Sequence, residues 1–364
     1  MDENTIYTAF LASLNDLNFE ERLLDVFGSA KAVYNAPEKL FFDIEGVTAA
    51  KINKIKNAKK TFDIDGFEER MKALNARFIT RNDVDYPEKL LQIPDAPMGF
   101  YIIGDETVLK MPAVAIVGSR KVTSYGVECT EKITSVLSQK GICIVSGMAQ
   151  GTDSYAHKAA INAGGKTVAV FGTGIDMCYP SMNLNLKRSI IYNGCVISEY
   201  PLGTRPEKWN FPFRNRIISG LADVVAVIEA DRRSGSMITA NHALDQDKTI
   251  MALPGNINSA LSNGTNLLIR DGAIPITAPI DVLEQMQIYL RQDGDDVREE
   301  QNNKIPLEND EKLVYDCMDS EPKSTDELVY MTKLSITDVI RLLSMLELKG
   351  YITKASGQKY MRCL

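Results

Sequence analysis

Cysteine and histidine are scarce in this sequence, and their scarcity argues against several kinds of site. The 364 residues include six cysteines and two histidines. The cysteines are scattered, with no C-x-x-C pair among them, which argues against a disulfide framework and against a structural zinc site. We therefore expect a reduced protein with no bound metal.

The sequence also lacks a long apolar run and a secretion signal. No apolar stretch approaches the roughly 18 residues that a membrane span requires. The first residues do not combine a basic start with an apolar segment, as a signal peptide does. We expect a cytoplasmic protein that does not contact membranes.

Positive charge is in deficit over the whole chain but not over its middle. The net charge is −7, whereas residues 111–285 carry 16 Lys and Arg against 14 Asp and Glu. So small a surplus is weak support for a nucleic-acid site, and the placement of the basic residues has to decide. The length of the chain suits two or three domains.

The middle of the chain has the pattern of a doubly wound α/β fold. Short apolar runs, typical of strands buried on both faces, alternate with helix-length stretches. The alternation predicts a Rossmann-like, mostly parallel sheet with helices on both sides. Two further apolar runs, within residues 75–105, are candidates for edge strands. The expected core strands are 113–118, 142–147, 167–172, 195–200, 223–230 and 249–255.

The N-terminal segment, residues 1–68, is predicted to be a small helical domain. Gly46, followed by a helix from Thr48, resembles a degenerate helix-hairpin-helix, a module whose turn approaches a phosphate backbone. The acidic balance of the segment favours the alternative, a domain for protein contacts. The extended Rossmann-like domain then spans residues 69–290.

The C-terminal part is predicted to be a linker and a winged helix. Residues 291–311 are acidic and poor in apolar side chains, as in a solvated linker. Residues 312–364 suit three helices and a β-hairpin, and the second helix opens with the capping-box spacing of Ser324 and Glu327. The third helix carries one arginine, which favours protein contacts over DNA reading. Its expected apolar face is Ile336, Val339, Ile340, Leu343 and Leu346, and its expected end is Gly350.

Glycine-containing turns follow several of the predicted strands. Ligands of doubly wound sheets bind beyond the carboxyl ends of the strands, so these turns face the expected site. Glycine lets the backbone approach an anion, and the helix that follows points its N–H groups the same way. No turn has a complete dinucleotide or P-loop motif, and we expect no cofactor. The candidate residues are Gly118, Ser119, Arg120, Gly147, Ser234, Gly235 and Ser236.

Residues 207–216 are the most informative segment, because they interleave cations with aromatic rings. The bases of a single strand stack on rings, while Lys and Arg follow the phosphates. We expect Phe211 to be the stacking ring, and Trp209 and Phe213 to be packed in the structure. The cations of the segment are Lys208, Arg214 and Arg216.

Seven motifs taken together resemble the DNA-processing protein A (DprA/Smf) family. In order, they are GSR, VSGMAQGTDSYAH, GTGIDMCYP, ISEYPLG, FPFRNRIISGL, EADRRSGSMITA and GTNLLIRDGA. The resemblance implies a sterile-alpha-motif-like domain before the core, a winged helix after it, a homodimer formed through the Rossmann-like domain, and no enzymatic activity. The implied function is to bind and protect single-stranded DNA during natural transformation and to load RecA recombinase onto it.

The resemblance also implies roles for individual residues. Arg120 matches the family's turn arginine that contacts DNA. Lys208 and Phe211 match the lysine and the aromatic residue that hold phosphate and base. The family's RNR motif is matched by Arg214, Asn215 and Arg216.

The sequence departs from the family's pattern at two positions. Ser181 follows the Tyr-Pro of the third turn, where many members have a lysine. Asp231 follows the fifth strand, where many members also have a lysine. Both changes reduce positive charge, so we expect weaker or more salt-sensitive binding.

An enzyme of the nucleotide-cleaving phosphoribohydrolase type is the main alternative. Such enzymes have related folds and also hold a 5′-phosphate with glycine turns and an arginine. They need a positioned acid or base, and we expect His157 to be packed rather than catalytic. The remaining candidates are Asp153, Glu199 and Glu229. A third alternative is a winged-helix regulator with a ligand-sensing core, which the weakly basic third helix disfavours.

Overall fold

The computed structural model describes residues 2–286, 309–318, 322–349, 351–355 and 359–362. It divides the chain into two compact units, Met1–Ile288 and Tyr289–Leu364. Within the described ranges, no helix combines the length and the apolar character needed to cross a membrane.

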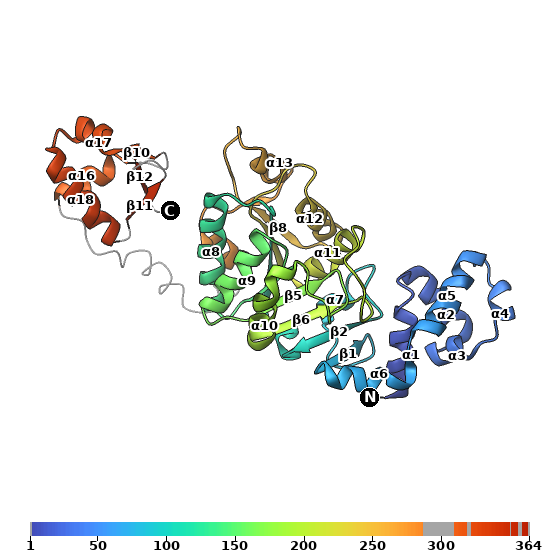
Figure 1. The fold of residues 1–364 in the computed structure, drawn as a ribbon. Coiled ribbons are helices and arrows are strands. Elements are labelled where there is room, and N and C mark those ends of the chain that lie inside the picture. Colours follow the sequence, from blue (N-terminus) through green and yellow to red (C-terminus); the bar gives the residue numbers. More distant parts are fainter. Residues whose placement is uncertain (1, 287–308, 319–321, 350, 356–358, 363–364) are drawn as a thin grey trace. The chain divides into compact units, whose positions relative to one another are not determined.

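The first unit is built on a central sheet with helices around it (Figure 1). The sheet has nine strands in the order β1-β2-β6-β5-β4-β3-β7-β8-β9. The pairs β1–β2 and β2–β6 are antiparallel, and the other pairs are parallel. All six predicted core strands are present, and the two runs within 75–105 extend the sheet beyond β6. The strands are β1 (Ala76–Thr80), β2 (Gly99–Gly104), β3 (Ala113–Val117), β4 (Cys143–Ser146), β5 (Thr167–Phe171), β6 (Gly194–Ser198), β7 (Val224–Val227), β8 (Thr249–Ala252) and β9 (Ile274–Pro275).

Helices cover both faces of this sheet, as the sequence predicts. One layer holds α8 (Ser124–Gln139), α9 (Thr152–Asn162), α10 (Leu184–Asn193) and α14 (Pro279–Gln285). The other holds α7 (Glu88–Leu91), α11 (Asn210–Leu221) and α12 (Gly235–Asp245), while α13 (Asn263–Arg270) packs near β8. Short 3-10 turns span Glu106–Lys110, Ser181–Asn183 and Ala260–Ser262. Strands β3 to β7 are completely buried between the layers, which explains their continuous apolar runs.

The winding of the sheet fixes where a ligand would bind. From β3 the chain proceeds outward through β4, β5 and β6, then returns past β3 to form β7. The order therefore reverses between β3 and β7. Ligands of doubly wound sheets bind at such a reversal, beyond the carboxyl ends of the strands.

Six helices precede the sheet and share a hydrophobic core with its edge. Gly46 has a φ of +74°, and the predicted helix follows it, with Thr48 as its N-cap. Phe10 and Phe67 pack in one cluster with Tyr101 of β2, and Arg81 pairs with Glu21. The predicted boundary at residue 68 falls inside the last helix. The helices are α1 (Glu3–Ala12), α2 (Leu17–Phe27), α3 (Ala30–Asn35), α4 (Lys39–Phe42), α5 (Ala49–Thr61) and α6 (Ile64–Ala73).

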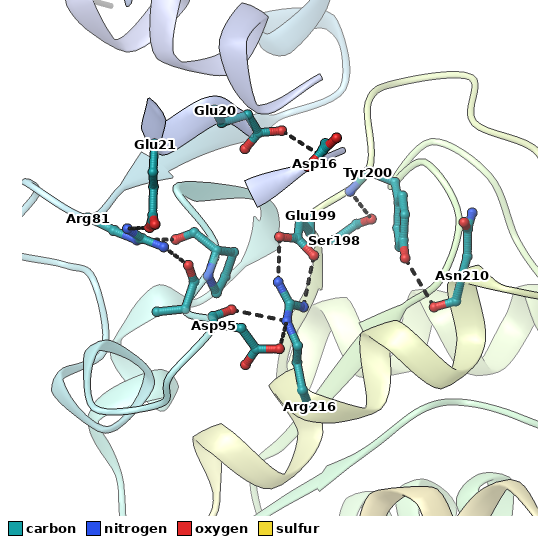
Figure 2. Close-up of polar contacts among 12 residues, drawn as sticks. Asp16, Glu20, Glu21, Arg81, Asp95, Ser198, Glu199, Tyr200, Asn210 and Arg216 are labelled. Atoms are coloured by element: carbon teal, nitrogen blue, oxygen red, sulfur yellow. Dashed lines mark hydrogen bonds and ion pairs between the residues drawn. The ribbon is translucent and has the colours of Figure 1, made fainter. Parts of the chain in front are cut away.

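Glu20 of α2 is buried within this helical segment. Its carboxylate accepts a hydrogen bond of 2.9 Å from the Asp16 N–H (Figure 2). Burial raises the pKa of Glu20 from 4.5 to about 8, and the nearby charge of Glu199 acts in the same direction. The folded chain therefore retains a proton that the unfolded chain releases. Since the pKa is higher in the folded state, the free energy of unfolding falls as the pH rises from 4.5 to about 8.

Replacing Glu20 by glutamine is expected to remove most of this pH dependence. The amide keeps the size of the protonated carboxyl and carries no proton that titrates in this range. Relative to the wild type, we expect a gain on the order of 2 kcal/mol in unfolding free energy on going from about pH 6 to about pH 8. Urea unfolding at both pH values measures it. Parallel pH profiles for the two proteins would contradict the assignment.

The second unit is a winged helix, as predicted. Its helices are α16 (Asn309–Asp316), α17 (Thr325–Thr332) and α18 (Ile336–Leu348), and its sheet has the order β10 (Lys323–Ser324), β12 (Lys359–Arg362), β11 (Ile352–Ala355). Ser324 and Glu327 form the predicted capping box. Of the predicted linker, residues 291–308 lie outside the described part of the chain, and residues 309–311 belong to α16. The predicted helix end, Gly350, also lies outside it.

The predicted apolar face of α18 is partly wrong. Val339, Leu343 and Leu346 are buried as predicted, together with Leu342. Ile336 and Ile340 are about half exposed, at 52% and 51%. The buried stripe follows positions 339, 342, 343 and 346, which is the i, i+3, i+4, i+7 pattern, and the two isoleucines lie on its flank.

Candidate nucleic-acid interface

The turns after β3 and β4 interlock at the carboxyl edge of the sheet. The backbone N–H of Thr152 donates a 3.1 Å hydrogen bond to the Ser119 carbonyl. A Cβ on Gly118 would lie 2.6 Å from the Thr152 hydroxyl, and one on Gly151, whose φ is +86°, would lie 2.3 Å from the Ser119 carbonyl oxygen. Only glycine fits at both positions. The interlocked turns present Arg120 to solvent.

Arg120 belongs to a cluster with two aromatic rings. Its guanidinium lies 5.9 Å from the centroid of the Phe211 ring, and the Tyr179 ring lies 5.3 Å from Phe211 at an angle of 35°. Asn210 donates a 3.1 Å hydrogen bond to the Gly172 carbonyl and so anchors the start of α11. A Cβ on Gly172 would lie 2.9 Å from the Phe211 ring. The turns after β3 and β5 and the start of α11 therefore meet at this cluster.

Lys208 and Trp209 are exposed beside the cluster. The prediction that Trp209 is packed in the structure is wrong, because 71% of its surface is accessible. Trp209 and Phe213 are four residues apart and share the outer side of α11, whereas Asn210 and Arg214 face inward. Phe213 is 42% exposed and its ring lies 4.0 Å from the Arg216 guanidinium, so it retains a structural contact.

Arg214 is buried, contrary to its predicted role in contacting DNA. Its guanidinium donates to the carbonyl of Gly147, which follows β4, and to that of Val170 in β5. Asp153 accepts hydrogen bonds from the N–H groups of Gly147 and Ala149 at 3.2 and 3.3 Å. Burial lowers the pKa of Arg214 to about 10, and burial raises that of Asp153. Arg214 and Asp153 therefore stabilise the turn after β4 through hydrogen bonds to its backbone, including that of Gly147.

Arg216 is also wrong as a predicted DNA contact, because its side chain is completely buried. It donates two hydrogen bonds to Glu199, of 2.9 and 2.7 Å, and pairs with Asp95 at 3.0 Å (Figure 2). Asn215 is 9% exposed and donates a 3.1 Å hydrogen bond to the Gly235 carbonyl, which joins α11 to the start of α12. The RNR motif is thus a structural support of the site.

The start of α12 lies at the same edge as the cluster. Ser234 occupies the N-cap position of the helix, its hydroxyl lies 2.7 Å from that of Ser236, and Gly235 is exposed. The two positions that depart from the expected pattern, Ser181 and Asp231, are exposed as well. Lysines at these two places would add charge at the surface without disturbing the core.

The candidate acids and bases of the enzyme alternative are engaged in structural contacts. Glu229 accepts hydrogen bonds of 2.8 and 2.6 Å from the N–H and hydroxyl of Thr123, at the start of α8. His157 is buried as predicted, and its Nδ1 lies 2.6 Å from the Thr167 hydroxyl. Burial lowers the pKa of His157 to about 3. Within the described ranges, no three His, Cys, Asp or Glu side chains gather as a metal site would require.

Comparison with known proteins identifies the family of the chain. The family model of DNA recombination-mediator protein A matches residues 77–287, and the model of the DprA winged helix domain matches residues 298–358. The chain belongs to the DprA/Smf family. Protein Smf of Synechocystis is 33% identical, over 94% of each chain.

Solved structures of DprA share the fold. DprA of Streptococcus pneumoniae superposes with a TM-score of 0.66 at 34% identity, covering 78% of this chain and 98% of that one. DprA of Helicobacter pylori gives a TM-score of 0.53 at 32% identity, covering 59% of this chain and 96% of that one.

The sequence analysis did not predict that Tyr179 belongs to the candidate site, where its ring lies beside Phe211. The available signal was its place in the turn after β5, at the expected edge of the sheet.

Proposed function

We propose that this chain is a DNA-processing protein that binds single-stranded DNA at the carboxyl edge of its sheet and catalyses no reaction. The observation that carries this proposal is the cluster of Arg120, Phe211 and Tyr179 beside the exposed Lys208. Rings stack on bases without demanding a sequence, and cations hold the phosphates between them. The interlocked turns after β3 and β4 fix the backbone position of Arg120 in the absence of DNA.

The names of relatives point to the same role. The relatives from Streptococcus pneumoniae and Bacillus subtilis are called DNA processing protein DprA, at 44% and 40% identity. The Helicobacter pylori structure is described by its single-stranded DNA binding mode. In this proposal Arg120, Lys208 and Phe211 contact the strand, and the backbone of Gly118, Ser119 and Ser234–Ser236 faces it.

The proposal extends to natural transformation and recombination. We propose that the protein protects incoming single strands, loads RecA recombinase onto them, and acts as a homodimer formed through the Rossmann-like domain. A gel shift with single strands, with and without added RecA, tests the loading step, and light scattering tests the dimer. Release of base or phosphate from a nucleoside monophosphate would instead favour the phosphoribohydrolase alternative.

Replacing Phe211 by alanine is expected to weaken binding by the free energy of one base–aromatic stacking contact. Base–aromatic stacking contributes about 1–3 kcal/mol, so affinity for oligo-dT should fall by roughly 5- to 150-fold. Fluorescence anisotropy measures the change. Tyr192→Ala is the matched control, because Tyr192 is an exposed ring (88%) outside the cluster. Equal affinities for the two variants would remove Phe211 from the site.

A further inference from the structure

A pocket of about 310 Å³ lies where α5 and α6 meet the loop after β6. Pro201 and Leu202 form one wall, and they begin the loop that leads to Lys208. Residues of α5, α6 and their connection form the other wall. The volume falls at the small end of the range of ligand pockets, about 300–1,000 Å³. The cluster around Phe211 does not use this pocket.

Aromatic rings line the pocket. Phe62 and Phe67 are stacked, with centroids 5.2 Å apart and an interplanar angle of 26°. Tyr101 packs behind Phe67, and no hydrogen bond to its hydroxyl is found in the described part of the chain. A tyrosine hydroxyl is neutral at neutral pH, and burial raises the pKa of Tyr101 further, so this group can only donate or accept as a neutral hydroxyl. Phe62 is the half-buried ring, and the Tyr101 hydroxyl is the donor without a partner in the described part of the chain. Such a pair suits a nucleobase, which offers a π-face and polar edges.

Two cations also line the pocket. Arg70 is exposed and forms no ion pair within the described ranges, and Lys54 donates only a long hydrogen bond of 3.4 Å to the Asn15 carbonyl. Asp63 lines the pocket too, but its carboxylate accepts the N–H of Gly66 at 2.9 Å and caps α6. The guanidinium and the ammonium are therefore available to an anion such as phosphate.

We infer that this pocket binds one nucleotide of the same single strand, with its base against the half-buried Phe62 and its phosphate on Lys54 and Arg70. The inference rests on the proposed function, because the strand reaches the pocket along the loop from Lys208 to Pro201. The N-terminal helices then contribute to DNA binding directly. This favours phosphate contact over the protein-contact alternative that the acidic composition suggested.

The double variant Lys54→Ala/Arg70→Ala tests the inference with oligo-dT of two lengths. The probes are about 6 and about 20 nucleotides long, one near the lower end and one beyond the upper end of the roughly 4–16 nucleotides that single-strand sites cover. The short probe can be held by the cluster around Phe211 alone, so its affinity should not change. The long probe should bind about tenfold more weakly. The slope of the logarithm of the binding constant against the logarithm of the salt concentration should also be smaller in magnitude, by about 0.7 for each phosphate that the variant no longer neutralises.

Lys56→Ala/Lys60→Ala is the matched control, since both lysines are exposed on α5 and neither lines the pocket. The control should bind both probes like the wild type. If Lys54→Ala/Arg70→Ala, with unchanged melting temperature, also binds both probes like the wild type, the inference is overturned. The inference is also overturned if free dTMP saturates the pocket in calorimetry while both probes bind the variant like the wild type. The pocket would then bind a free nucleotide and not a nucleotide of the DNA strand. A wild type that binds neither probe would defeat the proposed function itself.

Discussion

Replacing Arg120 and Lys208 together by alanine is expected to reduce the affinity for single-stranded DNA by about 100-fold or more, at low salt. Each side chain holds phosphate, so the salt slope should also fall by about 0.7 for each phosphate that is no longer neutralised. Both side chains are exposed and neither supports the core. The melting temperature should therefore stay close to that of the wild type. Anisotropy titrations at several salt concentrations measure both effects.

The control for this variant removes the same charge from the opposite edge of the sheet. Lys140 and Lys166 precede β4 and β5, at the amino ends of the strands. Lys140→Ala/Lys166→Ala should bind DNA nearly as the wild type does. If both double variants lose affinity equally, net charge alone governs binding and the site is not at the carboxyl edge.

Replacing Arg216 by methionine is expected to destabilise the fold by about 3–5 kcal/mol. The substitution removes two hydrogen bonds to Glu199 and the ion pair with Asp95, and it leaves the Glu199 carboxylate buried without its partner. The protein that remains folded should bind DNA normally, because Arg216 has no exposed surface. Urea unfolding and anisotropy on the same samples measure the two quantities.

A second variant separates the ion pair from the loss of packing. In Glu199→Gln/Arg216→Met both charges are absent, so no carboxylate is left buried without a partner. This double variant should regain part of the missing stability, because removing both partners of a buried pair is far less costly than removing one. Unchanged stability of Arg216→Met, together with a large loss of DNA affinity, would restore Arg216 as a DNA contact.

The sheet could be predicted from the sequence because its signal is local. A parallel strand buried on both faces is a continuous apolar run, and β3 to β8 each show one. The glycine turns were predictable for a related reason. They follow buried strands directly, so Gly118 and Gly147 had to lie at one edge of the sheet.

The fate of the basic and aromatic side chains could not be predicted, because it depends on distant residues. Arg216 is neutralised by Glu199, 17 positions away, and by Asp95, 121 positions away. Trp209 and Phe213 share the outer side of α11, but the sequence does not reveal where that helix begins. The pattern of cations and rings therefore predicts that a site lies in the loop before α11. It does not predict which of these side chains are exposed to solvent.

The most direct test of the proposed site uses the fluorescence of Trp209. The chain contains one tryptophan, and its exposed indole directly follows Lys208. Titration with oligo-dT should change the tryptophan emission in parallel with the anisotropy of labelled DNA, and in Arg120→Ala/Lys208→Ala both changes should require about 100-fold higher concentrations or more. If the wild type binds labelled DNA while its tryptophan emission stays constant, the strand does not pass the Lys208 loop, and the proposed site is wrong.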